Sequence, residues 1–459
     1  MKTSEQQQKI SIKVIWIIAI LALADVLVMA VPFYLKNVIS SVKISQGLGI
    51  SASQFSQANA IYGYVALLSY FVGGYFADRF NLKKLTLIGL AGIGVVSIWY
   101  GLIPFITNGK IIQVYVIFSL WSFITCFIFW SALWKLLSEQ GTPAENGKLN
   151  GIHGSLNGLI GTVLIAIAYL VFWLFENVWT ESLGHWAFST LVFIFSGLIF
   201  INCILLWKFV PNLNHNSNQN NNFDIKELGK TLKNFKLWIV TLLIMGVYMY
   251  QSGLSVFVTF MQDALKILPI IVVVAGILRT YFFRFLFSAP AGKLADRTQK
   301  YILFIVIGLS LASIITITAI SLPGYYETSF EQMSSTWKIV IQVLIVLLYL
   351  TLGIICWSLV TNRWATIYEI NISQKEYAAS VGLISFIAFS PDAWFWQIDS
   401  ILLKKYGTEA GYLTNKLANQ ISLAIITAIG LFAALAGILL LLILKREKHY
   451  NQQEQLATL

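Results

Sequence analysis

Charged residues are scarce in this 459-residue chain, where Asp, Glu, Lys and Arg together make up only 11% of the positions. Hydrophobic residues make up 58%, and the mean hydropathy is +0.75. A typical soluble domain carries about 25% charged residues, so this composition excludes an ordinary soluble globular protein. The chain is instead predicted to cross a membrane many times.

Cysteine is also rare, and Cys126, Cys203 and Cys356 all fall inside apolar runs without paired spacing. That pattern excludes a disulfide framework or a cysteine metal site and is typical of small packing residues. The sequence also lacks a nucleophile–base pair, a cluster of metal ligands, and a polar segment long enough for a kinase, nuclease or ATPase domain. We therefore expect no enzyme, no metal and no cofactor.

Long apolar runs are what the chain has in abundance. A run of about twenty residues can span roughly 30 Å of hydrocarbon as a helix. The first run follows several lysines but exceeds the usual length of a signal peptide and has no evident cleavage site, so we expect it to remain as helix 1. Twelve transmembrane helices are predicted, near residues 14–35, 54–76, 85–106, 111–134, 147–174, 187–208, 237–260, 268–290, 301–322, 338–361, 378–400 and 420–444.

The net charge of +11 could suggest a nucleic-acid partner. The distribution of lysine and arginine along the chain distinguishes this from a membrane protein. Lysine and arginine are concentrated in alternate loops, on the side that also carries both termini. The positive-inside rule then places both termini in the cytoplasm. We expect a lipid bilayer as the partner, that of a bacterial inner membrane, and no nucleic acid.

A repeated motif divides the chain into two equivalent parts. The pattern Gly-x-apolar-Ala-Asp-Arg ends at Asp78-Arg79 and again at Asp296-Arg297, each time between two apolar runs. The polar, asparagine-rich stretch 212–222 lies between the two copies and cannot bury enough apolar surface to fold alone. We expect an N-terminal six-helix bundle in residues 1–210, a cytoplasmic linker in 211–236 and a C-terminal six-helix bundle in 237–459.

Three capping patterns mark expected helix starts. They begin helices 2, 5 and 11, and they are Ser51-Ala52-Ser53-Gln54, Thr142-Pro143-Ala144-Glu145 and Ser373-Gln374-Lys375-Glu376. On helix 5, four glycines fall on one face and predict a close seam against helix 8. They are Gly151, Gly154, Gly158 and Gly161.

Charges inside the apolar runs are the first candidates for function. Arg279 lies about 20 Å from the cytoplasmic end of helix 8, near the midplane, where a cation costs on the order of 3 kcal/mol. We expect it either to face a central cavity and bind a carboxylate or phosphate, or to form a permanent ion pair. Arg284 is about 140° further around a regular helix, so we expect it to snorkel or to pair near the cytoplasmic gate.

Asp25 lies at a similar depth in helix 1. It could carry a proton, pair with a cation or contact the substrate directly. His153 and Asn157 are four residues apart on helix 5 and share a face, so both could line the cavity. His153 can titrate near neutrality and is a second coupling candidate, with a simple hydrogen-bonded histidine as the alternative.

Further polar residues lie in helices 7 and 11. Tyr248 and Gln251 sit between two glycines at the depth expected of a substrate site, although interfacial aromatic residues are the alternative for the tyrosine. Asp392 follows Pro391 near the expected end of helix 11. A kink at the proline would point Asp392 into the outer vestibule as a gate, or it would form a structural bend only.

The Asp78-Arg79 motif resembles the loop between helices 2 and 3 of the major facilitator superfamily (MFS), which reads Gly-x-Leu-Ala-Asp-Arg-x-Gly-Arg-Lys. Asn81 replaces the second glycine, a mild change because asparagine tolerates a left-handed backbone, and Leu82 replaces a basic residue. The resemblance implies an all-α membrane protein of two pseudo-symmetric six-helix bundles. It also implies that Asp78 with Arg79, and Asp296 with Arg297, latch helix ends as gating residues.

Other segments resemble a bacterial branch allied to the organophosphate:phosphate antiporters. They are Arg279-Thr280-Tyr281, Arg363-Trp364-Ala365 with Glu369, Gly382-Leu383-Ile384-Ser385-Phe386 and Ser390-Pro391-Asp392. The phosphate-ester members of that branch carry one arginine in helix 1 and another in helix 7. This chain has Asp25 in the first and no arginine in the second, which disfavours phosphate exchange.

The sequence thus predicts a secondary transporter that moves a small polar, anionic or zwitterionic solute by alternating access, with proton-coupled uptake favoured. An organic anion or phosphate-type exchanger is the alternative of the same class. A membrane sensor that binds a ligand without moving it is the alternative of another class. The predicted substrate-binding residues are Arg279, Asp25, Tyr248, Gln251 and Asn157.

Overall fold

The structure of the protein is a computed structural model that describes residues 11–77, 80–141, 146–177, 184–212, 233–324, 327–370, 372, 384–407 and 416–457. Within these ranges all regular secondary structure is helical, as the composition predicts. Ten helical segments of the described residues are long and apolar enough to cross a membrane. The predicted all-α membrane fold is confirmed.

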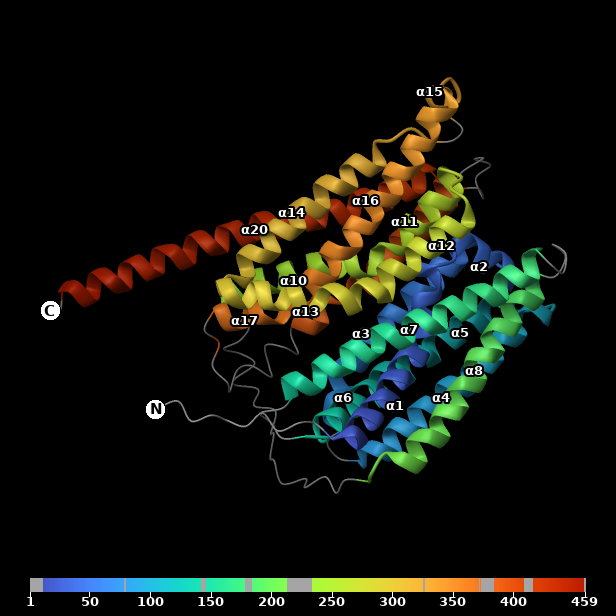
Figure 1. Ribbon diagram of the computed structural model, residues 1–459, viewed down its shortest axis with the longest axis horizontal. Coiled ribbons are helices and arrows are strands. Elements are labelled where there is room, and N and C mark those ends of the chain that lie inside the picture. Colours follow the sequence, from blue (N-terminus) through green and yellow to red (C-terminus); the bar gives the residue numbers. More distant parts are fainter. Residues whose placement is uncertain are drawn as a thin grey trace.

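The first half of the molecule, α1 to α8, fills the first six predicted spans (Figure 1). Its elements are α1 (Ile12–Met29), η1 (Ala30–Tyr34), η2 (Leu35–Asn37), α2 (Ser41–Leu48), α3 (Ala52–Ala77), α4 (Leu82–Leu102), η3 (Ile103–Phe105), α5 (Lys110–Ser122), η4 (Phe123–Phe129), α6 (Trp130–Ser138), α7 (Asn146–Asn177) and α8 (Gly184–Phe209). The short α2 lies outside the predicted spans.

The second half, α10 to α20, covers the described residues of the other six predicted spans, with residues 384–388 helical ahead of α19. Its elements are α10 (Phe235–Gly253), α11 (Ser255–Thr259), η7 (Phe260–Ala264), α12 (Pro269–Ile277), η8 (Leu278–Phe282), α13 (Phe283–Thr298), α14 (Tyr301–Ile320), α15 (Thr328–Glu331), α16 (Ser335–Asn362), η9 (Arg363–Ala365), α17 (Thr366–Glu369), α19 (Pro391–Tyr406) and α20 (Lys416–Ala457).

Local capping explains where α3 begins. The amide of Gln54 donates to the Ser51 hydroxyl at 3.2 Å, and the amide of Ser51 donates to the Gln54 side chain at 2.9 Å. Two orphan donors are thus satisfied reciprocally, which confirms the predicted capping box. The capping patterns predicted at 142–145 and 373–376 lie outside the described residues, as do Asp78, Arg79 and linker residues 213–232.

The second Asp-Arg motif, which the sequence placed between the spans predicted at 268–290 and 301–322, is still part of a helix. Asp296 and Arg297 belong to the last turn of α13, and the chain turns only at Gln299, whose φ is 53°. Asn81 does not use its tolerance for a left-handed backbone, because its φ is −64°. It is the N-cap of α4, and its side chain accepts a hydrogen bond from the Lys84 amide. Capping accounts for asparagine at this position.

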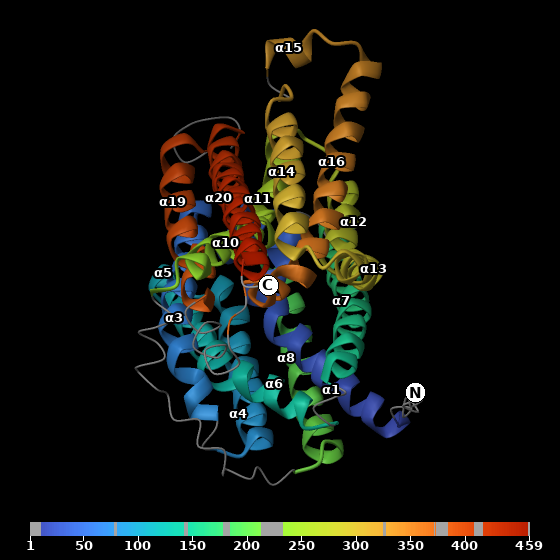
Figure 2. The same cartoon turned by 90° about the vertical axis from the view of Figure 1, so that its left-hand side faces the viewer.

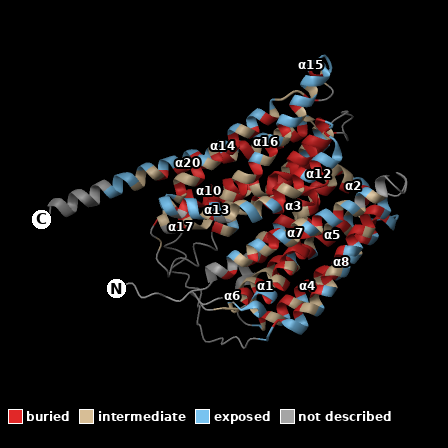
Figure 3. Cartoon of the chain, in the orientation of Figure 1, coloured by how far each residue is buried: buried red, intermediate tan, exposed pale blue. Residues whose placement is uncertain are grey.

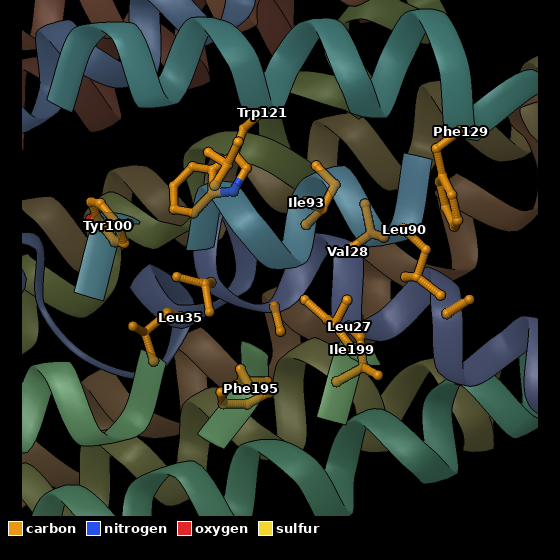
Figure 4. Packing of buried hydrophobic residues seen from close by; sticks show 14 of the residues in the cluster. Leu27, Val28, Leu35, Leu90, Ile93, Tyr100, Trp121, Phe129, Phe195 and Ile199 are labelled. Carbon is orange, nitrogen blue, oxygen red and sulfur yellow. The ribbon is translucent and has the colours of Figure 1, made fainter. Parts of the chain in front are cut away.

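The buried apolar side chains form two main clusters, which Figure 3 shows as two inner bands. One cluster lies within residues 17–210, and the other within residues 237–440 together with Ala60. In the first, Leu27 and Val28 lie near Ile93 and Ile199 (Figure 4). Many large apolar side chains remain exposed on the outer helix faces. A surface of that kind suits contact with lipid tails.

Both ends of the described chain lie at the same end of the molecule, since α1 begins and α20 ends there (Figure 1). We call this the terminal end and the opposite one the far end. Figure 2 shows α19 above α3 and α13 above α7, and both pairs are in contact. These two pairs join the halves.

The halves are held together by close backbone approach at mid-length and by hydrogen bonds at the far end. In the middle of α3, a Cβ at Gly63 would lie 2.0 Å from the backbone of Asp392, so α3 and α19 nearly touch there. The Ser400 hydroxyl donates to the Ser53 carbonyl at 2.7 Å, and the Ser40 amide donates to the Gln262 side chain at 3.1 Å. The far end is therefore closed.

The glycine face of α7 shows where the halves separate. A Cβ at Gly161 would lie 2.1 Å from the Tyr281 ring, and one at Gly158 would lie 3.1 Å from Phe285. These contacts confirm the predicted seam against the eighth span. Gly151 and Gly154 belong to the same face but would meet no atom within 4 Å. The two spans thus pack in their middle and diverge toward the terminal end.

Candidate functional site

The candidate site lies where three spans leave regular α-helical geometry. Pro32 falls within the π-helical segment η1, where it cannot donate the backbone hydrogen bond of a regular helix. Arg279 belongs to the π-helical segment η8, and α16 ends in the 3₁₀ turn η9, which begins with Arg363. Such π-helical turns are frequent at functional sites because they redirect side chains.

Arg279 is buried, with only 2% of its surface exposed, and its guanidinium reaches across the two halves. It donates to the Asn37 side chain of the first half at 3.1 Å, and to the backbone carbonyls of Tyr250 and Gln251 at 3.3 and 2.9 Å. Trp357 donates to the Arg279 carbonyl at 2.5 Å. Among the described residues no carboxylate pairs with Arg279, so its positive charge is stabilised only by neutral amide and carbonyl oxygens.

A second network joins Asp25 to the second half through Asn157. The Asn157 amide donates to the Asp25 carboxylate at 2.6 Å and accepts from Arg284 at 2.7 Å. His153 lies 3.9 Å from the same carboxylate. The structure therefore brings together the three residues that the sequence placed on the first and fifth spans.

Arg284 pairs with a side chain of the first half, which is one of the two outcomes predicted for it, and its place near a cytoplasmic gate stays a prediction. It pairs with Asn157 at mid-length, and its guanidinium lies over the Trp357 ring at 5.1 Å. The angle of 140° assumed a regular α-helix between Arg279 and Arg284. The intervening η8 segment has more residues per turn, so that assumption fails.

Gln251 connects to an arginine that was not among the predicted site residues. The Arg363 guanidinium donates to the Gln251 side chain at 2.6 Å and lies 5.5 Å from the centre of the Phe389 ring. The sequence singled out Arg363 only for a family resemblance. The sequence feature that could have identified it is a cation at the end of an apolar run, followed directly by Trp364.

Asp392 faces the seventh span and not an outer vestibule. It accepts from the Tyr248 hydroxyl at 2.5 Å and from Ser252 at 2.9 Å, and only 7% of it is exposed. Pro391 is the first residue of α19, which runs on to Tyr406. Proline is tolerated at this position because the first amide of a helix has no partner within the helix, so its absence costs no hydrogen bond. The helix of this span is interrupted at residues 389–390, directly before Pro391, which agrees with the predicted structural bend; the span does not end there, because α19 runs on to Tyr406.

Lys36 is a buried cation that sequence reasoning assigned to a loop. Only 2% of it is exposed, its Nζ donates to Asn59 at 2.9 Å, and it lies 3.8 Å from the centre of the Trp396 ring in the second half. Asp392 and Asp399 are within electrostatic range. Its place directly after the first apolar run concealed it, because the run continues as η1 and η2.

Replacing Lys36 with methionine is expected to lower the stability of the folded protein by about 2 kcal/mol, because Asn59 and two buried carboxylates lose a cationic partner. Methionine keeps the apolar stem of the side chain. Thermal unfolding of the purified protein in detergent measures the change. Lys110→Met is the control, since Lys110 also lies near the far end but donates to Pro104 of its own half. Equal unfolding midpoints for the two variants would contradict the prediction.

One tyrosine lies close enough to three arginines to be influenced by their charge. Tyr34 is half-buried and lies within electrostatic range of Arg279, Arg284, Arg363 and Asp25. Its ring meets that of Tyr281 edge-on at 5.2 Å. The centre of the interface thus holds more cations than carboxylates, which favours an anionic ligand.

The remaining predicted residues contribute less to this picture. Asp296 and Arg297 lie in the last turn of α13, where Arg297 is exposed, so their gating role stays a prediction. In the residues that the structure describes, no group of three or more His, Cys, Asp or Glu side chains could hold a metal ion.

Comparison with known proteins places this arrangement in a family. Residues 11–393 match the sequence profile of the Major Facilitator Superfamily. The chain belongs to the Major Facilitator Superfamily. The resemblance carried by the Asp-Arg motif is therefore confirmed at the level of the superfamily, and the fold and family indicate a transporter.

Relatives of this MFS chain occur in two bacteria. The MG294 homolog of Mycoplasma pneumoniae is 32% identical over 95% of this chain and 93% of its own length. The inner membrane proteins YqcE and YihN of Escherichia coli are each 22% identical, over 78% and 77% of this chain and 81% and 80% of their own lengths. This MFS chain is thus a multi-pass membrane protein with relatives in the bacterial inner membrane.

Solved structures show the same fold. The nucleoside transporter NupG superposes with a TM-score of 0.68 at 14% identity, over 93% of this MFS chain and 99% of that one. A bacterial homolog of the human lysosomal transporter Spinster, in an inward-facing and occupied conformation, has a TM-score of 0.64 at 12% identity. It covers 92% of this chain and 96% of that one.

Proposed function

We propose that this protein is a secondary active transporter that moves a small anionic or zwitterionic solute by alternating access, coupled to proton uptake. The observation that supports it most is that Arg279 and Arg284 hydrogen-bond across the interface to Asn37 and Asn157 in an MFS fold, with Arg363 bound to Gln251 beside them. Uncompensated guanidinium groups at mid-membrane are costly and are typical of a site for an anion. Asp25, Tyr248, Gln251 and Asn157 border the same network.

The moving units of this proposal are residues 1–210 and 237–459, joined by the linker 211–236. Closure at the far end and divergence at the terminal end are what one state of a rocking mechanism requires. With both termini in the cytoplasm of a bacterial inner membrane, this state is inward-facing. Asp78 with Arg79, and Asp296 with Arg297, would latch the terminal end in the opposite state.

Arg279 takes part in both states in this proposal. Here it bonds to Asn37 and to two carbonyls of the seventh span, which holds the halves together. Separation of the first and eighth spans would break the bond to Asn37 and free one face of the guanidinium for the solute. Asp25 would carry the coupled proton, with His153 beside it.

Exchange of one organic anion for another is the second candidate. The surplus of central arginines favours it, since an anion can neutralise them in both directions of transport. It also agrees with the resemblance to the branch allied to the organophosphate:phosphate antiporters. Proton-coupled uptake differs from exchange in needing a buried carboxylate such as Asp25.

Flux into proteoliposomes tests the proposal. Carboxylates, phosphorylated metabolites, amino acids and nucleosides would be offered with and without an inward proton gradient, after a thermal-shift screen for stabilising ligands. We expect one anionic or zwitterionic solute to enter faster with the gradient. Entry that needs a counter-solute but no gradient would favour exchange. A ligand that stabilises the protein but never enters would overturn transport.

Arg279→Lys should still fold but bind the transported solute about tenfold more weakly, because an ammonium cannot bridge the two carbonyls and the solute together. Binding is measured by the thermal shift as a function of solute concentration. Equal affinity in both proteins would remove Arg279 from the site.

A further inference from the structure

We infer that Arg363 and the aromatic side chains around it bind a solute whose anionic group is carried on a flat ring. This inference deepens the proposed function by naming the class of solute. It rests on a cluster of five half-buried side chains from three spans: Arg363, Trp364, Phe389, Tyr248 and Gln251.

The protein satisfies only some of the hydrogen-bond donors of Arg363. One terminal nitrogen donates to Gln251, whereas Nε is buried and has no partner. The other terminal nitrogen makes no hydrogen bond to the described residues. A guanidinium donates through a planar fork of five N–H groups, so several donors remain for a carboxylate or phosphate. A buried unpaired donor is costly unless a ligand completes it.

The charge of Arg363 is also uncompensated. No carboxylate of the described residues forms an ion pair with it, and the other charge in its vicinity with a marked effect is Arg284, which is also positive. Asp392, the carboxylate on the next span, is already held by Tyr248 and Ser252. An anionic ligand would supply the missing negative charge.

Beside the guanidinium the aromatic rings form a continuous wall. Arg363 lies 5.5 Å from the centre of the Phe389 ring and 5.7 Å from that of Trp364. The Phe389 ring meets Trp364 edge-on at 6.3 Å and Tyr248 at 4.5 Å. These three rings are only half-buried, so part of their surface is open to a planar ligand, and stacking contacts add to affinity beyond area burial.

The wall borders the space between the halves and not the lipid. Arg363 donates to Gln251, whose carbonyl accepts from Arg279, and Arg279 in turn reaches Asn37 of the first half. All five side chains keep some exposed surface at this depth. A ligand that enters between the halves can therefore reach the open donors and the ring faces together.

The test uses four small probes on the purified full chain in detergent: benzoate, cyclohexanecarboxylate, phenyl phosphate and inorganic phosphate. We expect benzoate and phenyl phosphate to raise the unfolding midpoint more than their non-aromatic counterparts. Arg363→Gln should weaken both ring-bearing probes by about tenfold or more. Phe389→Leu, which keeps an apolar side chain without a ring, should abolish the preference for benzoate over cyclohexanecarboxylate.

Two further variants keep the test decisive. Arg363→Lys retains the charge and should bind more weakly than the native protein but better than Arg363→Gln, whereas Arg446→Gln changes an exposed arginine of α20 and should bind all probes normally. Equal binding by Arg363→Gln and the native protein, or no aromatic preference in the native protein, would overturn the inference. Because binding is measured without flux, failure of transport alone would count against the proposed function only.

Discussion

Replacing Gly161 with alanine should shift the protein away from the conformation in which the far end is closed. The added Cβ would lie 2.1 Å from the ring of Tyr281, which is fully buried and also packs against Tyr34. The ring has no free space to move into, and overpacking of this kind costs about 2 kcal/mol. Such a cost changes the ratio of two states by about thirtyfold.

Labelling at the far end measures this shift. Ala52 is buried against Leu403 and Ala418 of the second half, so a cysteine placed there reacts with a maleimide only when the halves part. The half-buried native Cys203 is first replaced by serine. We expect faster labelling of Ala52→Cys in the Gly161→Ala background.

Gly154→Ala is the matched control for Gly161→Ala. It lies two turns earlier on the same face of α7 and would meet no atom within 4 Å, so the closed far end should persist. Labelling should then be no faster than in the parent protein. If Gly161→Ala and Gly154→Ala label alike, the seam does not control the far end.

Asp25→Asn should abolish the response of solute uptake to a proton gradient. The carboxylate is 5% exposed and accepts from Asn157, which in turn bonds to Arg284 of the second half. Asparagine has the same shape but cannot take up or release a proton, so the coupling is lost while the packing is kept. Solute exchange without a gradient should continue.

Uptake into proteoliposomes with and without an inward proton gradient gives this measurement. Asp263→Asn is the control, because Asp263 is a half-buried carboxylate in η7, near the far end of the seventh span. It should still respond to the gradient. Unchanged gradient-driven uptake in Asp25→Asn would reject Asp25 as the coupling group and leave exchange as the better explanation.

Much of the fold could be predicted because it depends on local physics. A membrane span needs about twenty apolar residues wherever it lies, so the predicted runs coincide with the helical segments of the described residues. The start of α3 followed from the Ser51 capping box, whose partners lie three residues apart. The Gly158–Gly161 seam followed from the period of the helix.

The candidate site was harder to predict because it depends on how helices are rotated against each other. Arg279 and Asp25 were found as charges at mid-depth, but the sequence could not indicate that Arg279 reaches Asn37 or that Asn157 links Asp25 to Arg284. Irregular segments such as η8 change the direction of later side chains, and no simple sequence period marks them.

The sequence by itself determined that this is a two-part helical membrane protein with charges at mid-depth, since hydrophobic length and repeated motifs are properties of the chain alone. Only the tertiary structure decided which charges meet. Arg363 lies against the Phe389 ring and Lys36 is buried against the Trp396 ring, and both contacts join spans that are distant in the sequence. Those contacts depend on packing of whole helices, which no local pattern encodes.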